Sequence, residues 1–409
     1  MQGNNFATMS AMKPLYLALS AMFVQQSFVM MAKVTTPIAA AVAFPALGVD
    51  ATAVGIFVGF YSCCQIVIVM FSGNLIRRYG GLRISQIGLL SILIGMLAAI
   101  TGSIWAFALT AIFVSFGVSV STPASAQIIA RYAPPKLAPL IFSAKQTAVP
   151  VGQIASGLLV PFLAALYGWQ GAFVGVGLLC FSLAFLLEPT RKELDQDRDP
   201  HHPLSPSSIK GDIKFALQNP SLRMLVLMQG AFTGLWSVYV TYFVVFFIDR
   251  MHYSLSEAGA IFATATFIGL PGRMLWGYAA GRWMSSNAVL ALLGFFTTFT
   301  VILTGFNSAA WPTWALLTVA VGVNIASTGW QGIALSEMAR LSPPGKVGAV
   351  TGSIIGLSCI GQVIMPPMFS VVLWLTDSYA LGFTLVAIPT SVVGVMMLVS
   401  DRRTVHEAK

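Results

Sequence analysis

The sequence predicts an all-α integral membrane protein with twelve transmembrane helices, arranged as two duplicated six-helix bundles. Hydrophobic residues make up 57% of the 409 residues and charged residues only 9%, whereas a soluble domain carries about 25% charged residues. Apolar stretches of the length that crosses a hydrocarbon core recur along the whole chain. Polar landmarks of the first half also return in the second half at a constant spacing. A water-facing globular fold is therefore excluded.

Twelve apolar stretches account for the predicted spans. The first is long enough to cross a bilayer and lacks an obvious cleavage pattern, so we expect it to remain as a membrane anchor. The spans are expected to start near Pro14, Thr52, Leu82, Trp105, Pro139 and Gly171, and then near Leu222, Glu257, Asn287, Pro312, Val347 and Ser378.

Basic residues follow alternate spans. Arg78 follows the second span, Lys136 the fourth and Arg340 the tenth, whereas the intervening gaps carry few positive charges. An excess of Lys and Arg marks the loops on the cytoplasmic side. We therefore expect both termini to be cytoplasmic, and the central segment with them. This placement also explains the net charge of +9 without nucleic acid as a partner.

The central segment divides the chain into an N-terminal bundle, residues 1–188, and a C-terminal bundle, residues 220–409. Between them, residues 189–219 mix charges with Pro and Ser and show no apolar period. This composition is typical of a cytoplasmic linker loop, with a possible short surface helix after Ser207. The adjacent His201 and His202 fit a solvated pair better than a metal site.

An internal repeat relates the two halves. The string RYAPP at residues 131–135 corresponds to RLSPP at 340–344, and Gly152-Gln153 corresponds to Gly361-Gln362. Both pairs of landmarks are 209 residues apart. One shared offset indicates duplication, an architecture that many secondary transporters use around a midplane site.

The loop after the second span carries the string GNLIRRYGGLR, which resembles the signature of the major facilitator superfamily. Arg77 stands where that family carries an acid, and Gly281 replaces the acid that is common in the second-half loop. In that family the loop acid helps to hold the halves together on the cytoplasmic side, so this chain needs other contacts there. The loop residues with an expected gating role are Gly73, Arg77, Arg78, Gly80, Gly277 and Arg282.

The resemblance covers essentially the whole chain and implies a secondary transporter rather than an enzyme. It implies a small-molecule solute and membrane lipid as partners, a monomer, and no cofactor. The strings SAKQTAVPVGQ and GWQGIALSEMAR are similar to bacterial members that carry small organic solutes. They suggest a multi-pass protein of the bacterial inner membrane.

Arg273 is the first candidate for solute binding. It stands four residues before Gly277, a spacing at which monocarboxylate and oxalate carriers of the family often have a substrate-binding Arg. A guanidinium offers two parallel donors to a carboxylate and keeps its charge. The alternative is an Arg that snorkels to the headgroups.

Two lysines lie inside predicted spans, where an ionisable group suggests function. Lys145 is followed by a polar stripe that includes Gln146 and Gln153, and Lys33 shares a helix face with Gln26. Either lysine could supply positive charge to an anion, or could snorkel to an interface.

Polar and aromatic residues of the seventh and tenth spans are candidates for the cavity wall or, equally, for helix–helix contacts. Glu337 is a candidate for ion coupling, although Arg340 at helical spacing suggests an intrahelical pair. The candidate wall residues are Trp236, Asn324, Thr328 and Gln331.

The preferred function is secondary transport of a small organic anion, a carboxylate, by alternating access of the two bundles. No Asp or Glu occurs between Asp50 and Glu188, so we expect anion exchange, or proton symport through the substrate or Glu337. Three alternatives stay open: a Cu(I) importer using Met224, Met228 and His252, an exporter of drugs or neutral solutes, and a transport-inactive sensor. Apart from that copper alternative, no metal site is expected.

Overall fold

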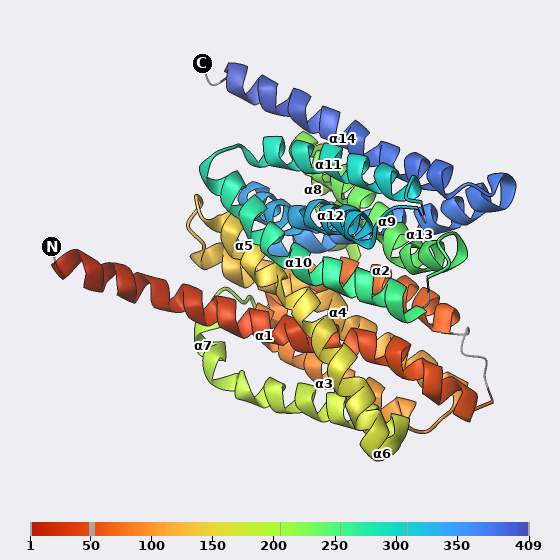
Figure 1. Ribbon diagram of the computed structural model, residues 1–409. Helices are drawn as coiled ribbons and strands as arrows, with labels where there is room; N and C mark the ends of the chain where they lie inside the picture. Colours follow the sequence, from red (N-terminus) through yellow and green to blue (C-terminus); the bar gives the residue numbers. More distant parts are fainter. Residues whose placement is uncertain (1, 49–53, 205, 254, 309, 408–409) are drawn as a thin grey trace. The chain divides into compact units, whose positions relative to one another are not determined.

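The computed structural model describes residues 2–48, 54–204, 206–253, 255–308 and 310–407. Within these ranges every regular element is a helix (Figure 1). The first half contains α1 (Gln2–Ala46), α2 (Val54–Tyr79), α3 (Gly81–Ala99), α4 (Ile104–Tyr132), α5 (Ala138–Gln146) and α6 (Ala148–Leu186). The central segment contains the 3-10 turn η2 (Glu188–Thr190), α7 (Arg191–Leu194) and α8 (Pro206–Gln218). The second half contains α9 (Pro220–Asp249), α10 (Leu255–Arg282), α11 (Ser286–Gly305), α12 (Thr313–Leu341), α13 (Val347–Thr376) and α14 (Tyr379–Glu407).

These helices make twelve passes across the membrane, because α5 and α6 together form two passes that are separated at Gly168. The ladder of α6 is broken at Gly168, whose φ of 71° and ψ of 174° lie outside helical values. Such a φ suits glycine because it has no Cβ. The fifth pass therefore consists of α5 and the part of α6 before Gly168, and the sixth pass consists of the remainder. The predicted twelve-helix membrane fold is confirmed.

The described residues contain nine stretches that are long and apolar enough to cross a membrane, and one of them, Ala138–Leu194, holds both the fifth and sixth passes. The two passes outside this set are α10 and α12. These helices carry Arg273, Asn324 and Gln331, so their lower hydropathy has a direct cause. Spans that face protein or water can be more polar than spans that face lipid.

The predicted span starts agree with the helices to within three residues, except for the first. At α9, for example, the Asn219 side chain accepts hydrogen bonds from the N–H groups of Ser221 (3.0 Å) and Leu222 (3.3 Å), and Pro220 occupies the first turn. Both features are typical of helix starts. Helix α1 instead begins at Gln2, because hydropathy marks the membrane-crossing part of a helix and not its end.

The helices form two compact units. Unit 1 comprises residues 1–133, 145–216 and 342–356, and unit 2 comprises residues 134–144, 217–341 and 357–409. Compared with the predicted bundles, segment 134–144 joins unit 2 and segment 342–356 joins unit 1. These two segments correspond to each other under the 209-residue offset, so the departure from the predicted division is itself symmetrical.

Close helix packing repeats the internal symmetry within each unit. In unit 1 a Cβ on Gly152 of α6 would overlap the carbonyl oxygen of Ser27 on α1. In unit 2 a Cβ on Gly361 of α13 would overlap the carbonyl oxygen of Gly230 on α9. Small residues allow membrane helices to approach this closely. The landmark glycines of the repeat therefore make equivalent contacts in the two halves.

Candidate functional site

Lys145 is the centre of a buried polar cluster in unit 1. It lies in the last turn of α5, its side chain is fully buried, and its Nζ donates to the Oε1 atoms of Gln26 on α1 and of Gln146 (3.2 Å to the latter). Both acceptors are neutral amides. Since the sequence has no acid between Asp50 and Glu188, no carboxylate of helices α2 to α6 can neutralise this ammonium.

The cluster extends onto α4. The Nε2 of Gln26 donates to Thr122 (3.4 Å), so the Gln26 amide uses its oxygen towards Lys145 and its nitrogen towards α4. The Ser121 hydroxyl donates to the Oε1 of Gln25 (2.8 Å), and the Nε2 of Gln25 is buried without a partner in the described part of the chain. A buried unpaired donor is costly, and it leaves hydrogen-bonding capacity for an incoming group.

Two other predicted residues of this half lie apart from Lys145. Gln153 is exposed, so it does not share the buried environment of Gln146. Lys33 is partly exposed, and its Nζ lies 5.6 Å from the ring centroid of Tyr61 on α2. This distance is typical of a cation–π contact. The lysine that contacts Gln26 is Lys145 of α5.

Arg273 of α10 is a buried cation of unit 2. Its side chain is 7% exposed, and its Nη1 donates to the Oε1 of Gln331 on α12 at 3.4 Å. Helices α10 and α12 approach closely one turn away, because a Cβ on Gly269 would lie 2.8 Å from the Cβ of Asn324. The structure thus brings together two of the residues that the sequence assigned to the solute site.

The other predicted wall residues of unit 2 make mostly local contacts. The Nδ2 of Asn324 donates to the Ala320 carbonyl (3.0 Å), and Thr328 donates to the Asn324 carbonyl (2.5 Å), both within α12. The Oδ1 of Asn324 is buried and has no partner among the described residues. Trp236 stacks on Tyr239 of the same helix, with ring centroids 5.7 Å apart.

Glu337 forms the intrahelical pair that its spacing suggested. Its Oε2 accepts from the Nε (2.9 Å) and the Nη2 (2.7 Å) of Arg340. The Glu337 side chain is 13% exposed and the Arg340 side chain 65%. This contact neither requires nor excludes ion coupling, so that role stays a proposal.

The structure separates the residues named for the copper alternative. Met228 and His252 are separated by most of α9, which is continuous from Pro220 to Asp249. Twenty-one helical residues between Met228 and Asp249 span about 32 Å. One ion cannot be bound by the methionine pair and His252 together. Among the described residues, no group of three or more His, Cys, Asp or Glu side chains could hold a metal ion.

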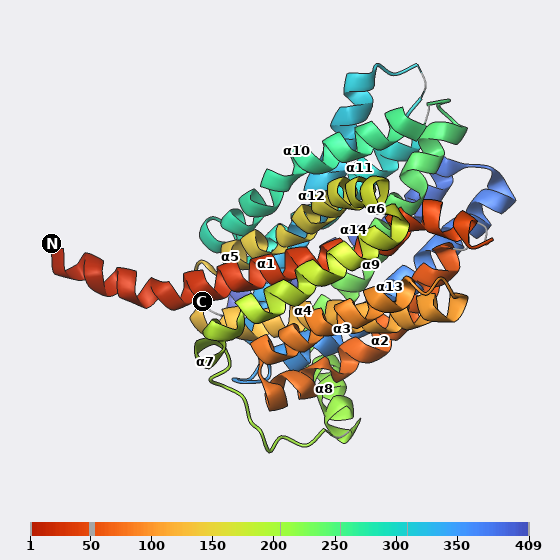
Figure 2. The same ribbon diagram turned by 90° about the horizontal axis from the view of Figure 1, so that it is seen from below.

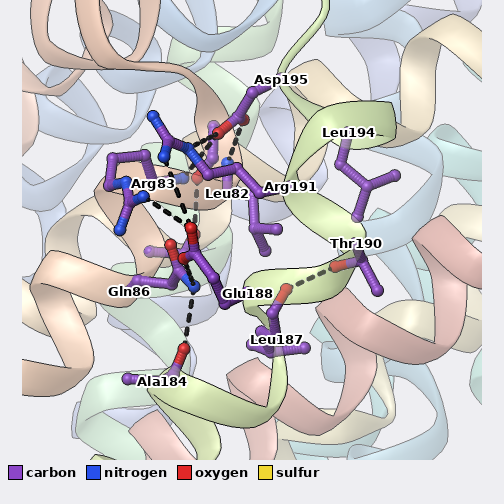
Figure 3. A network of polar contacts seen from close by, with 12 residues as sticks. Leu82, Arg83, Gln86, Ala184, Leu187, Glu188, Thr190, Arg191, Leu194 and Asp195 are labelled. Atoms are coloured by element: carbon purple, nitrogen blue, oxygen red, sulfur yellow. Dashed lines mark hydrogen bonds and ion pairs between the residues drawn. The ribbon is translucent and has the colours of Figure 1, made fainter.

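The loop signature lies at the end of unit 1 that also carries the central segment, here called the linker end. Arg77 pairs with Asp212 of α8 at 3.2 Å, and both side chains are 13% exposed. Arg83 pairs with Glu188 at 2.9 Å, and Gln86 donates to the same carboxylate at 2.9 Å. Arg77 and Arg83 therefore pair with acids that follow α6 in the sequence. Figure 3 shows the contacts of Arg83 and Gln86 with Glu188.

Asp195 caps the start of α3. Its two carboxylate oxygens accept from the N–H groups of Leu82 (2.6 Å) and Arg83 (2.9 Å). Gly80 precedes this helix with a φ of 94°, and a Cβ there would overlap the carboxylate. Burial raises the pKa of the Asp195 carboxyl, while the two N–H groups act in the opposite direction. A carboxylate at a helix N-terminus is also favoured by the helix dipole.

A second linker acid reaches α13. Asp197 pairs with Arg131 and accepts from the Nε2 of Gln127 at 2.7 Å. The Oε1 of Gln127 in turn accepts from the N–H of Gly348 at 2.8 Å. The linker therefore makes ordered contacts with the helices of unit 1, and the short helix expected after Ser207 is present as α8. Figure 2 shows the linker running from α7 through an extended loop to α8.

Sequence reasoning missed Asp195, Asp197, Asp212 and Gln127. The signal was present in the charge distribution, because residues 51–187 contain four arginines and no acid and are followed at once by an acid-rich segment. The other gating residues behave less uniformly. Arg78 lies 5.7 Å from the Tyr79 ring centroid and Arg282 is exposed.

The signature glycines admit neighbouring helices. In unit 1 a Cβ on Gly73 would overlap Ala349 at the start of α13. In unit 2 a Cβ on Gly277 would overlap Ser143 of α5. Each glycine thus packs against one of the two segments that depart from the predicted bundles.

Comparisons with known structures agree with this fold. The human organic anion transporter MFSD10 (TETRAN) superposes with a TM-score of 0.74 at 16% identity, covering 94% of this chain and 99% of that one. The E. coli fucose:proton symporter FucP gives 0.74 at 15% identity, covering 95% and 98%. A bacterial homologue of the iron transporter ferroportin gives 0.72 at 14% identity, covering 95% and 98%. These identities establish the fold alone, and the three proteins are named for different solutes.

No curated protein sequence is significantly similar to this chain. The sequence profile of the Major Facilitator Superfamily, in contrast, matches residues 15–366. The matched region contains the loop signature, the repeated landmarks and the polar residues around Lys145 and Arg273. The chain belongs to the Major Facilitator Superfamily and is a multi-pass membrane transporter, not an enzyme.

Proposed function

We propose that this transporter carries a small organic anion, a carboxylate, and that Arg273 and Lys145 are its anion-binding groups. The observation that carries the proposal is the burial of these two cations, 7% and 0% exposed. The Lys145 ammonium donates to the side-chain amides of Gln26 and Gln146. An amide oxygen accepts a hydrogen bond but does not neutralise a charge. A charge inside a membrane protein is expensive, and an anionic solute would bring to Lys145 the negative charge that no carboxylate of helices α2 to α6 can supply.

The two cations suit different parts of this task. The guanidinium of Arg273 can donate two parallel hydrogen bonds to one carboxylate, and Gln331 orients it from α12. Lys145 supplies a compact positive charge within a set of amides and hydroxyls from α1 and α4. Fold similarity does not choose the solute, because the same fold serves sugars, organic anions and metal ions.

The membrane setting is part of the proposal. The basic residues of the linker end support a cytoplasmic position for that end, the linker and both termini, and we propose the bacterial inner membrane as the location of the protein. We propose a monomer. Coupling runs by anion exchange, or by a proton that travels with the solute or through Glu337. Uptake that is proton-driven and unaffected by Glu337→Gln would leave only the solute route.

Binding to the purified protein tests the proposal. A thermal-shift screen against monocarboxylates, dicarboxylates, neutral sugars and Cu(I) identifies a ligand, and calorimetry then measures its affinity. Arg273→Lys keeps the charge but loses the fork, so affinity should fall markedly, and Arg273→Gln should abolish binding. Truncating one partner of a buried charge pair costs about 2–5 kcal/mol, roughly 30- to several-thousand-fold in affinity.

Arg282→Lys is the matched control, since Arg282 lies on the same helix and is exposed. It should leave the affinity unchanged. Carboxylate binding that survives Arg273→Gln, in correctly folded protein, would remove Arg273 from the site. Binding of neutral solutes alone would overturn the anion proposal, and a fully inert protein would favour the sensor alternative.

A further inference from the structure

The linker supplies most of the described negative charge at the linker end of unit 1. Arg77 and Arg131 pair with Asp212 and Asp197 of the linker, and Arg83 pairs with Glu188, which directly precedes the linker. The sequence carries an arginine at position 77, where the loop signature of related transporters has an acid. The carboxylates that pair with these arginines therefore come from the segment that follows α6, and not from the signature loop.

The Asp197 carboxylate contacts α13 indirectly, through the side chain of Gln127. Asp197 accepts from the Nε2 of Gln127, which fixes which way the Gln127 amide points. The amide oxygen then faces the N–H of Gly348, which is the second residue of α13. The first N–H groups of a helix have no partner within the helix, so Gln127 satisfies one that would otherwise be left open.

The start of α13 is packed tightly where this bond forms. Gly348 approaches Ile76 and the Pro123 carbonyl, both 3.2 Å from a Cβ placed on that glycine. Gly352 approaches Ser72 and the Val69 carbonyl, 2.6 and 2.7 Å from such a Cβ. Residues 342–356 belong to unit 1 for this reason, whereas the rest of α13 belongs to unit 2.

We infer that Asp197 is a positioning residue for transport: through Gln127 it holds the start of α13 against α2 and α4, and so sets how readily the linker end opens. A solute can pass this end only when residues 347–356 leave α2 and α4. The Asp197–Gln127–Gly348 chain stabilises the packed arrangement and not the open one. The linker thereby stabilises the closed arrangement of this end, which in related transporters is the role of the loop acid that this chain lacks. This inference does not depend on which solute is carried.

Accessibility of Ser353 tests the inference. Ser353 is 1% exposed and lies in the packed segment, and Ser353→Cys changes only the oxygen to sulfur. In a background with the four native cysteines replaced, a small maleimide should modify this thiol only when the linker end opens. Asp197→Ala should raise the modification rate about tenfold, since it removes a charge-assisted hydrogen bond. Asp197→Asn, which keeps the shape, should raise it less.

Asp199→Ala is the matched control. It removes the same charge two residues away, where the Asp199 side chain accepts from the N–H of His201 in its own loop (3.1 Å), and it should leave the rate unchanged. Gln127→Ala should act like Asp197→Ala, and the double variant should add nothing further, because both break one chain.

A purely structural role makes different predictions. Equal modification rates in Asp197→Ala and Asp199→Ala, or full additivity with Gln127→Ala, would overturn the inference. If Asp197→Ala lowers protein yield, the Asn variant decides, since a folded Asn variant with an unchanged rate would contradict it as well. Solute affinity, measured beside the rate, should change less than the maximal uptake rate.

Discussion

Replacing Gly73 by Ala tests whether close packing at the linker end controls opening. A Cβ at this position would overlap both Cα and Cβ of Ala349 on α13. Ordinary carbon–carbon contacts are about 3.5–4.0 Å, so the helices must separate to admit it. Overpacking of this kind costs about 1–3 kcal/mol.

The cost applies only to the arrangement in which α13 is packed on α2. An open linker end has no such overlap, so the substitution should raise the open population about 5- to 150-fold. The maleimide modification rate of Ser353→Cys measures that population. Solute uptake should fall if opening at the opposite end then becomes limiting.

Two variants sharpen this test. Gly59→Ala lies on the same helix, has no neighbour within 4 Å of the added Cβ, and should change nothing. Ala349→Gly, combined with Gly73→Ala, removes one of the two overlapping atoms and should partly restore the original rate. A Gly73→Ala rate equal to that of Gly59→Ala would refute the packing argument.

Two further predictions concern charged groups of unit 1. Lys145→Met should abolish anion binding and leave the protein folded, since replacing a buried charge by an apolar residue of similar length is often tolerated; calorimetry and thermal unfolding check this, and retained binding would contradict it. Burial, with the Arg77 guanidinium, lowers the pKa of His202 below 6.5. The unfolded state then binds more protons between that lowered pKa and 6.5, so stability should fall as the pH falls through this window. Thermal unfolding between about pH 5 and 8 should show this loss, and His202→Gln should remove it.

The fold was predictable because the membrane imposes simple rules on the sequence. Span lengths follow from the thickness of the hydrocarbon core, and eleven of the twelve helix starts follow from the apolar runs. The break near Thr147 was not predicted. Helix α5 ends at Gln146 and α6 begins at Ala148 within one apolar run, so hydropathy carries no sign of the interruption.

The candidate site was predictable by residue type but not by partner. Intramembrane charge identified Arg273 and Lys145, and burial agrees with that selection. The bond from Lys145 to Gln26 joins residues 119 positions apart, and no local pattern encodes such a pairing. The contacts of the linker acids were not predicted for a related reason. These acids follow no apolar period, and their partners are arginines in distant segments of the chain.

The duplicated sequence also explains why two short segments depart from the predicted bundles. Segment 134–144 packs in unit 2 against Gly277 of the second signature loop, and segment 342–356 packs in unit 1 against Gly73 of the first. In both cases the glycine admits the first turns of a helix that continues into the other unit. Among the described residues, the linker carboxylates reinforce this contact in unit 1 through Gln127 and Arg131. The described packing is repeated in the two units, whereas the linker carboxylates lie in unit 1, so control of opening through the linker should act on the start of α13.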